Sequence, residues 1–341
     1  MQELVFFYSE GHEAHDWAGQ AECAARLESV RRALDGAGLW DRYPHLQTVD
    51  LPAAVLHAVH DPKYLEELVD MHAHGEWVDH ETYACAGTYQ VAIDAAGGST
   101  AVARAVWRQE ARRGFALVRP PGHHAYRERG MGFCVLNNAA LAAEYLRQEE
   151  GAQRVAIIDI DVHHGNGTQD IFYQRNDVLY VSMHQFPHYP NSGRPDQIGD
   201  GDGVGVTLNV PIPLHTGDRG YAENMQQLVL PMLDRFKPEI LLVSAGFDGH
   251  WTDPLARQLL TADGYAGLVK SLVDWSDQNC MGRIALILEG GYDLEALGHC
   301  ALAATQALLG QAWQDPLGAS PYPESVEWQD MLIRLKRVWK I

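Results

Sequence analysis

The sequence predicts an α/β protein with three layers, in which a mainly parallel sheet lies between two layers of helices. Two observations carry this prediction. From residue 115 onward, short apolar runs alternate with segments of helical spacing, which is the pattern of crossovers between parallel strands. Most of the runs are apolar at consecutive positions, as expected for strands that helices cover on both faces. No break in the alternation indicates a domain boundary, so we expect a single domain over residues 1–341.

The chain before residue 115 contains one expected strand and three expected helices. Residues 1–8, M-Q-E-L-V-F-F-Y, are typical of a first strand. Apolar residues at helical spacing predict a helix over 22–37, where glycine ends it. The dipeptide Asp61-Pro62 is typical of an N-cap and a first helical turn, and this helix extends to about residue 74. A third helix is expected over about 88–107.

The rest of the chain alternates between the two kinds of element. The expected strands are residues 115–119, 154–160, 178–183, 204–210, 239–245 and 283–288. The expected helices are residues 138–149, 167–174, 221–236, 262–276 and 294–309. The connection over residues 185–203 is too long for a plain turn, and because aromatic residues lie among its turn formers, we expect a functional loop.

Composition excludes several classes of protein. The chain has 341 residues and a formal net charge of −19 at pH 7, a field that repels nucleic acid and attracts cationic ligands. No stretch approaches the roughly 18 uninterrupted apolar residues of a membrane helix, and the N-terminus does not resemble a signal peptide. The five cysteines form no C-x-x-C pair, which argues against structural zinc and a disulfide framework. We therefore expect a cytoplasmic protein that binds neither nucleic acid nor membrane.

The predicted site begins in residues 157–167, I-I-D-I-D-V-H-H-G-N-G. Because side chains alternate along a strand, Asp159, Asp161 and His163 would leave its carboxyl end on one face. Open α/β sheets bind ligands at that edge. A carboxylate and an imidazole two residues apart suit a divalent metal such as zinc, with Asp159 orienting them from behind. The alternative is that these polar residues only form a loop.

Three further expected strands end in polar motifs. His123 and His124 occur in R-P-P-G-H-H, Asp248 in A-G-F-D and Tyr292 in E-G-G-Y. Each motif alone has a purely structural alternative. The two histidines could be hydrogen-bonded loop residues, the aspartate could cap a helix, and the tyrosine could pack at the rim of a pocket. Because the carboxyl ends of parallel strands lie at one edge of a sheet, we expect the motifs to converge on one site.

The converging side chains predict metal-assisted hydrolysis of an amide. Asp161, His163 and Asp248 give three protein ligands and leave one position of a zinc ion open for water. The tandem imidazoles supply a general base for that water and an acid for the leaving amine. The Tyr292 hydroxyl, after a Gly-Gly turn, is a donor to a developing oxyanion.

These motifs resemble those of the zinc-dependent histone deacetylase and acetylpolyamine amidohydrolase superfamily. The segments R-P-P-G-H-H, G-F-C-V-L-N-N, D-I-D-V-H-H-G-N-G-T-Q, A-G-F-D and E-G-G-Y occur in that order over about residues 20–310, and G-N-G-T-Q is most similar to class II deacetylases and their bacterial relatives. The resemblance implies an arginase-like fold with an eight-stranded parallel sheet between helical layers. It places the catalytic core at about residues 20–310 and a C-terminal tail at about 311–341.

The resemblance also implies two ions. One catalytic Zn²⁺ would be bound by Asp161, His163 and Asp248. A monovalent cation, typically potassium, would lie near Asp159, Asp161, His163, Ser182 and Met183.

For catalysis, the resemblance implies a division of roles among five residues. His124 is the principal general base and acid, and His123 is its neighbour. Tyr292 polarises the substrate carbonyl. Asp159 lies behind His123 and Asn166 behind His124, where class I members carry an Asp in place of Asn166.

The resemblance further implies a narrow tunnel for the acyl chain, with an arginine, Arg26, beneath the site. The tunnel residues are Gly132, Phe133, Tyr189, Leu255 and Glu81. Glu81 lies where many members carry an Asp that holds the substrate backbone. Tyr189 takes a position that is often Phe, which adds a hydroxyl at the tunnel mouth.

The combined prediction is a deacylase that removes an acetyl-type group from the side-chain amine of a lysine in a protein or peptide. The alternative is an acetylpolyamine amidohydrolase, which the acidic charge favours, although Leu255 lies where a polyamine-selective member places a glutamate. A non-catalytic acyl-lysine binding module would not need the metal ligands, the bases and Tyr292. A binuclear manganese hydrolase would need a second ligand cluster, which the sequence does not show. The sequence leaves the oligomeric state open.

Overall fold

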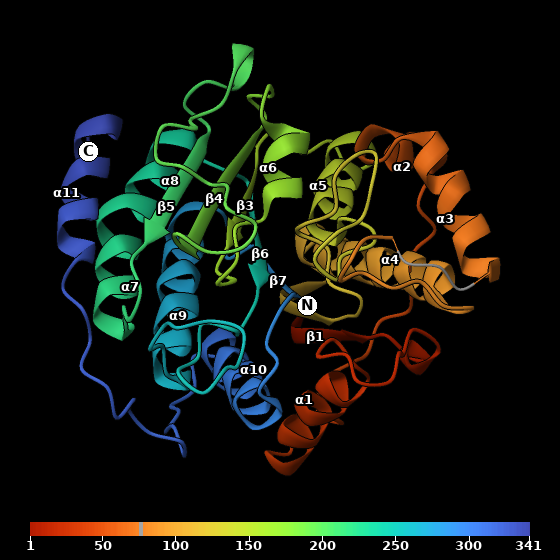
Figure 1. Ribbon diagram of the computed structural model, residues 1–341, viewed down its shortest axis with the longest axis horizontal. Coiled ribbons are helices and arrows are strands. Elements are labelled where there is room, and N and C mark those ends of the chain that lie inside the picture. The colour runs from red at the N-terminus through yellow and green to blue at the C-terminus, as the bar shows by residue number, and fades with distance from the viewer. Residues whose placement is uncertain (75–77) are drawn as a thin grey trace.

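Seven parallel strands form one sheet through the middle of the molecule (Figure 1). The computed structural model describes residues 1–74 and 78–341. The strands are β1 (Gln2–Tyr8), β2 (Ala111–Leu117), β3 (Val155–Asp159), β4 (Val178–Gln185), β5 (Thr207–Ile212), β6 (Ile240–Ala245) and β7 (Ile284–Leu288). Their order is β1-β2-β7-β6-β3-β4-β5, and every neighbouring pair is parallel. The predicted parallel α/β sheet is therefore confirmed.

Helices cover both faces of this sheet (Figure 1). One layer consists of α1 (Ala25–Gly36), α7 (Asp218–Asn224), α8 (Leu230–Phe236), α9 (Ala262–Asn279), α10 (Leu294–Leu308) and α11 (Trp328–Trp339). The other consists of α2 (Ala53–Val59), α3 (Pro62–His74), α4 (Thr88–Trp107), α5 (Asn138–Gln148) and α6 (Asn166–Phe172). Consecutive residues of β3 alternate between the layers, since Ile158 packs with the first and Ile157 with the second. None of the helices in the described ranges is both long and apolar enough to cross a membrane.

The sheet has seven strands in the described part of the chain, whereas the resemblance implied eight. The segment that comes nearest to a further strand is residues 44–46, which lies parallel to β1 with a single bridge between His45 and Phe6. Phe6 N donates to the Pro44 carbonyl at 2.9 Å, and Leu46 N donates to the Phe6 carbonyl at 2.7 Å. Pro44 has no amide hydrogen with which to extend this ladder. The expected count was therefore wrong by one strand.

The helix expected over residues 221–236 is interrupted. Between α7 and α8 the chain forms one π-helical turn, Met225–Val229. Pro231, in the first turn of α8, has no amide hydrogen, so the regular α-helical hydrogen bond at that position is absent. Three smaller differences concern α2, which was not predicted, and the starts of two strands. β2 begins at Ala111 rather than at residue 115, and β5 begins at Thr207 rather than at residue 204 because residues 201–203 form a 3₁₀ turn.

Four neighbouring strands carry the predicted motifs. β2, β7, β6 and β3 are adjacent in the sheet, and the R-P-P-G-H-H, E-G-G-Y, A-G-F-D and D-V-H-H motifs follow their carboxyl ends. In the register, Asp159 at the end of β3 pairs with Ser244 near the end of β6, so the two following loops start from the same edge. The parallel topology thus gathers motifs that are far apart in the sequence.

Candidate active site

Asp161, His163 and Asp248 form a buried cluster at the carboxyl edge of the sheet. Asp161 and His163 follow β3, and Asp248 follows β6. One potential ligand atom from each lies within 4.8 Å of those from the other two. His163 Nδ1 is 3.1 Å from both Asp161 Oδ1 and Asp248 Oδ2. The structure therefore brings together the three side chains that the sequence predicts as metal ligands.

Backbone amides fix the two carboxylates of the cluster. Gly290 N donates to Asp161 Oδ2 at 2.9 Å, and Val162 N donates to Asp248 Oδ1 at 2.9 Å. A Cβ atom on Gly290 would lie 2.1 Å from Asp248 Oδ2 and 2.6 Å from Asp161 Oδ2, so glycine is needed for the chain to pass this close. Each carboxylate presents its other oxygen to His163.

Two carboxylates this close need a positive charge between them. Burial by itself lowers the pKa of His163, but Asp248 and Asp161 outweigh it and raise that pKa to about 10. The pKa of Asp161 is lowered in spite of its burial, because His123 and His163 lie beside it. The cluster is therefore built around a cation, which can be a proton or a metal ion.

His123 lies beside this cluster and is paired with a carboxylate. Its Nδ1 donates to Asp159 Oδ2 at 3.0 Å, and the Tyr180 hydroxyl donates to the same oxygen at 2.9 Å. Burial opposes a charge on the ring, but Asp159 and then Asp161 raise the pKa of His123 to about 10. His123 is consequently protonated at neutral pH.

His124 has a neutral partner instead. Its ring centre lies 4.0 Å from that of His123, and its Nδ1 lies 2.6 Å from Asn166 Oδ1. The amide nitrogen of Asn166 faces the sulfur of Met131 at 3.4 Å, so the amide oxygen is the acceptor and His124 Nδ1 carries the hydrogen. Burial, and then the charges of His123 and His163, hold the pKa of His124 well below its usual value. The neutral ring therefore offers Nε2 as a proton acceptor.

Tyr292 is held from two sides. Arg26 donates to the Gly291 carbonyl at 2.7 Å and also to the Glu289 carbonyl, while its guanidinium carbon lies 4.9 Å from the centre of the Tyr292 ring. On the other side, Asp253 Oδ2 accepts a hydrogen bond from Tyr292 N at 2.7 Å. Burial raises the pKa of Tyr292 well above its usual value, so the hydroxyl keeps its hydrogen and can donate it.

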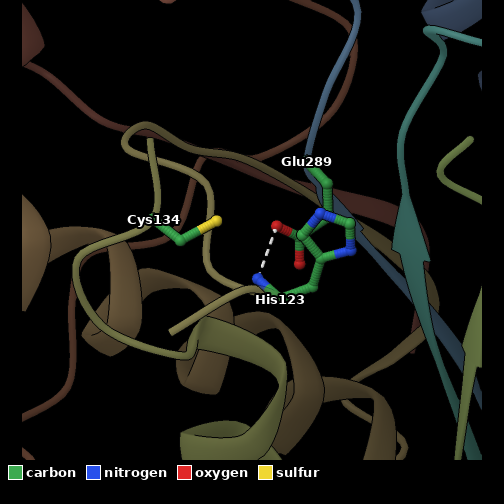
Figure 2. A group of neighbouring side chains, drawn as sticks. All are labelled: His123, Cys134 and Glu289. Atoms are coloured by element: carbon green, nitrogen blue, oxygen red, sulfur yellow. Dashed lines mark hydrogen bonds between the residues drawn. The ribbon is translucent and has the colours of Figure 1, made fainter. Parts of the chain in front are cut away.

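Glu289 supports the backbone of the histidine pair. Its Oε2 accepts from His123 N at 3.1 Å, the dashed line in Figure 2, and from Gly122 N at 2.6 Å. Its Oε1 accepts from the Ser244 hydroxyl at 3.1 Å. Figure 2 shows the Cys134 thiol pointing toward the Glu289 carboxylate, and burial keeps the pKa of that thiol well above its usual value. Because both oxygens of Glu289 already accept hydrogen bonds, this group fixes His123 in place.

A cavity of about 190 Å³ leads to these residues. His124, His163 and Tyr292 contribute to its lining. The five residues predicted for the tunnel also line it, namely Glu81, Gly132, Phe133, Tyr189 and Leu255. His188 lines it as well, with its ring stacked on His163 at 4.9 Å between centres. The cavity thus joins the predicted tunnel to the predicted metal ligands.

The tunnel wall is tight at Gly132. Its φ of 56° is left-handed, and a Cβ atom there would lie 2.5 Å from His124 Cδ2 and 3.1 Å from the Tyr189 hydroxyl. Phe133 also has a left-handed φ, of 68°, and its amide donates to Thr82 Oγ1 at 3.0 Å. A non-glycine residue in this conformation is held by its surroundings, which fixes the aromatic wall of the tunnel.

The residues predicted for a monovalent cation lie on β3, on β4 and in the turn after β3. Asp159 and Ser182 are paired in the register of these strands, and both are buried. The Ser182 hydroxyl lies 2.9 Å from His184 Nδ1, and Asp159 Oδ1 accepts from Asp161 N at 3.2 Å. The Met183 side chain packs into the core beneath the first helical layer. For Met183, only the backbone carbonyl is therefore a candidate ligand.

Three residues that shape the site were not predicted as site residues. His188 lies in the connection that was expected to be functional, but nothing in the sequence distinguishes it from its neighbours. Glu289 belongs to the quoted E-G-G-Y motif, in which only the tyrosine was assigned. Asp253 follows the A-G-F-D motif by five positions, and its role depends on a contact with Tyr292 that the sequence does not reveal.

Comparison with known proteins agrees with this arrangement. The family model described as the histone deacetylase domain matches residues 20–308. The chain belongs to the histone deacetylase family. Its relatives include the histone deacetylase-like amidohydrolase of Pseudomonas aeruginosa, which is 38% identical over 88% of this chain and 80% of its own. A probable deacetylase of Methanothermobacter thermautotrophicus is 36% identical over 93% of this chain and 94% of its own.

The histone deacetylase fold is also found in a solved structure. The crystal structure of the HDA15 HD domain superimposes with a TM-score of 0.90 at 32% identity, covering 99% of this chain and 95% of that one.

Histone deacetylase 14 of Arabidopsis thaliana, described as chloroplastic, is 38% identical over 87% of this chain and 74% of its own. Membership of this family makes the protein a hydrolase that acts on amide bonds.

Proposed function

We propose that the protein is a zinc-dependent deacylase that removes acetyl-type groups from lysine side chains of proteins or peptides. The observation that carries this proposal is the buried Asp161–His163–Asp248 cluster, reached through a narrow cavity. Its donors are two carboxylates and one imidazole, a set that suits zinc and leaves a coordination position open. When bound, such an ion supplies a Lewis acid and lowers the pKa of water.

The side chains of the protein would handle the protons. His124 Nε2, the free acceptor of a neutral ring, takes a proton from the attacking water and returns one to the leaving amine. His123, protonated through Asp159, stabilises the negative charge that develops beside it. Tyr292 donates its hydroxyl hydrogen to the substrate carbonyl as that oxygen becomes negative.

The cavity favours a linear amine with an apolar stem. Phe133, Tyr189 and Leu255 supply carbon surface for the methylenes of a lysine side chain. Leu255 offers no charge to a second ammonium group, which supports a lysine substrate over a polyamine. Glu81 is the carboxylate in the lining and would accept a hydrogen bond from the peptide backbone.

We extend the proposal to a potassium ion near Asp159. The oxygen atoms of Asp159, Asp161 and Ser182, with backbone carbonyls of His163 and Met183, are hard donors of the kind that such cations prefer. This ion would help to hold the loop that carries two of the zinc ligands.

A competition assay tests the substrate assignment. An acetyl-lysine peptide, acetylspermidine and a longer acyl-lysine peptide are offered together to the protein before and after removal of metal and readdition of Zn²⁺. We expect the acetyl-lysine peptide to be cleaved fastest, and activity to be lost with the metal and restored with zinc. Preferential cleavage of acetylspermidine would overturn the lysine assignment, and full activity without metal would overturn the mechanism.

A further inference from the structure

A second cavity, of about 440 Å³, lies against the tunnel. His188 and Leu255 line both cavities, so this pair of residues forms the wall between them. His188 Nε2 donates to the Leu255 carbonyl at 3.0 Å, which ties the loop after β4 to the loop after β6. A substrate in the tunnel therefore has a second hollow directly beside it.

Arg257 is the cationic residue that lines this second cavity. Its backbone is fixed at both ends, because its N–H donates to Gln185 Oε1 and its carbonyl accepts from His215 N, each at 2.9 Å. Gln185 is itself buried at the end of β4. The position of the arginine is thus set by the fold, and the exposed residue forms part of the lining of the cavity.

The charge of Arg257 is available to a ligand. The residue is exposed, and no carboxylate of the described residues forms an ion pair with its guanidinium. The guanidinium is close enough to His188 to add to the lowering of the pKa of that ring, after burial and the charge of His163. In a chain with a formal net charge of −19, this cation beside the tunnel is a local positive charge.

We propose that the second cavity is a subsite for a carboxylate of the substrate, supplied by an acidic residue two positions from the acyl-lysine in a peptide. This proposal rests on the proposed function. A guanidinium matches a carboxylate with two parallel hydrogen bonds, which a lysine or a neutral side chain cannot do. In an extended peptide, side chains two positions apart lie on the same face about 7 Å apart, so a residue two positions from the lysine can reach the adjoining cavity.

The two cavities differ in the charge that they offer. Glu81 lines the tunnel and not the second cavity, whereas Arg257 lines the second cavity and not the tunnel. The carboxylate suits donors such as the peptide amide, and the guanidinium suits an acceptor. A substrate with a donor backbone and an acidic neighbour matches both, while a polyamine meets an unfavourable charge at Arg257.

Three peptides test the proposal, each blocked at both ends and containing acetyl-lysine with Glu, Gln or Lys two positions away on each side. For the wild type, we expect kcat/KM for the Glu peptide to exceed that for the Lys peptide by about fivefold, the scale of a partly exposed ion pair. Arg257→Gln should remove this preference, and Arg257→Glu should reverse it. Arg219→Gln, which removes an exposed arginine on α7 that lines neither cavity, should leave it unchanged.

Free acetyl-lysine and its amide are compared in parallel, because an α-carboxylate has the same chemistry as an acidic side chain. A preference for the free acid that is lost in Arg257→Gln, without a preference for the Glu peptide, would overturn the assignment to an acidic neighbour. Equal cleavage of the three peptides by the wild type, or a Glu preference that survives in Arg257→Gln, would overturn the subsite alone. Cleavage of acetylspermidine but of none of the peptides would overturn the proposed function.

Discussion

His124 Nδ1 lies 2.6 Å from the amide oxygen of Asn166. The neighbouring ring, His123, has the carboxylate of Asp159 at the equivalent place, at 3.0 Å. One imidazole thus has a neutral partner and the other a charged one, and their pKa values move in opposite directions. The difference leaves His124 as the neutral ring of the pair, which is the state that the proposed proton acceptor requires.

Asn166→Asp should shift the pH dependence of the reaction. A carboxylate beside His124 favours the charged imidazole, so it raises the pKa of His124. The base must be unprotonated to act, and the acidic limb of the kcat/KM profile should therefore move to higher pH by about one unit. An acidic limb in the same place as that of the wild type would show that Asn166 does not control this proton.

Asp248→Ala should lose the bound metal. The substitution removes one of three ligands and leaves Asp161 and His163 alone, so metal analysis should find a clear loss from the expected single ion per chain. Asp196→Ala is the control, because that carboxylate is exposed and pairs with Arg194. A variant of Asp248 with undiminished metal content would contradict the ligand assignment.

Tyr292→Phe should lower kcat by about 10²–10³-fold, the usual effect of removing one donor to an oxyanion. The ring and its contact with Arg26 remain, so metal content and thermal stability should stay close to those of the wild type. If kcat falls by only a few-fold, the tyrosine merely packs against the tunnel.

Leu255→Glu should shift selectivity toward acetylspermidine. A carboxylate at this wall can meet the second ammonium group of a polyamine. The ratio of kcat/KM for acetylspermidine to kcat/KM for the acetyl-lysine peptide should therefore rise, by an amount that corresponds to about 1–2 kcal/mol in activation free energy. Glu81→Gln serves as the matched comparison. Should the wild type already favour acetylspermidine and Glu81→Gln abolish that preference, the charge at Glu81 and not residue 255 would set the selectivity.

Gly132→Ala should abolish most activity and also lower stability. A left-handed backbone costs a non-glycine residue about 1–2 kcal/mol, and the new Cβ would also lie 2.5 Å from His124 Cδ2. Gly151→Ala separates the two effects, because Gly151 has a φ of 77° with no neighbouring atom within 4 Å. We expect both Gly132→Ala and Gly151→Ala to lose stability, and only Gly132→Ala to lose activity. Equal activity of both variants would mean that His124 tolerates the contact.

Local pattern was sufficient to predict most of the fold. Apolar runs and helical spacing predicted β1 and the alternating elements, because both faces of this sheet are buried and strands such as β3 and β7 are apolar at consecutive positions. The π-helical turn at Met225–Val229 was not predictable from spacing, since α- and π-helical turns have similar apolar patterns. α2 is only seven residues long, too short for its periodicity to be read.

The convergence of the predicted site residues could be inferred from the sequence, but their geometry could not. Parallel strands direct their carboxyl ends to one edge, so the convergence of four motifs followed from topology alone. Which ring nitrogen of His124 carries the hydrogen depends on the orientation of the Asn166 amide, and only the three-dimensional structure reveals that orientation. The second cavity likewise depends on Gln185, His215 and Arg257 meeting in space, and no local sequence pattern records that contact.

The last strand of the chain lies in the middle of the sheet, where β7 joins β2 on one side to β6 on the other. When residues 1–283 have left the ribosome, the other six strands of the described sheet have been synthesised. The part of the sheet that ends at β2 and the part that ends at β6 still lack the strand that joins them. Each part exposes an apolar, unpaired edge during that interval, which is the kind of surface that aggregates or recruits chaperones. The catalytic edge can accordingly assemble only after the end of β7 has been synthesised.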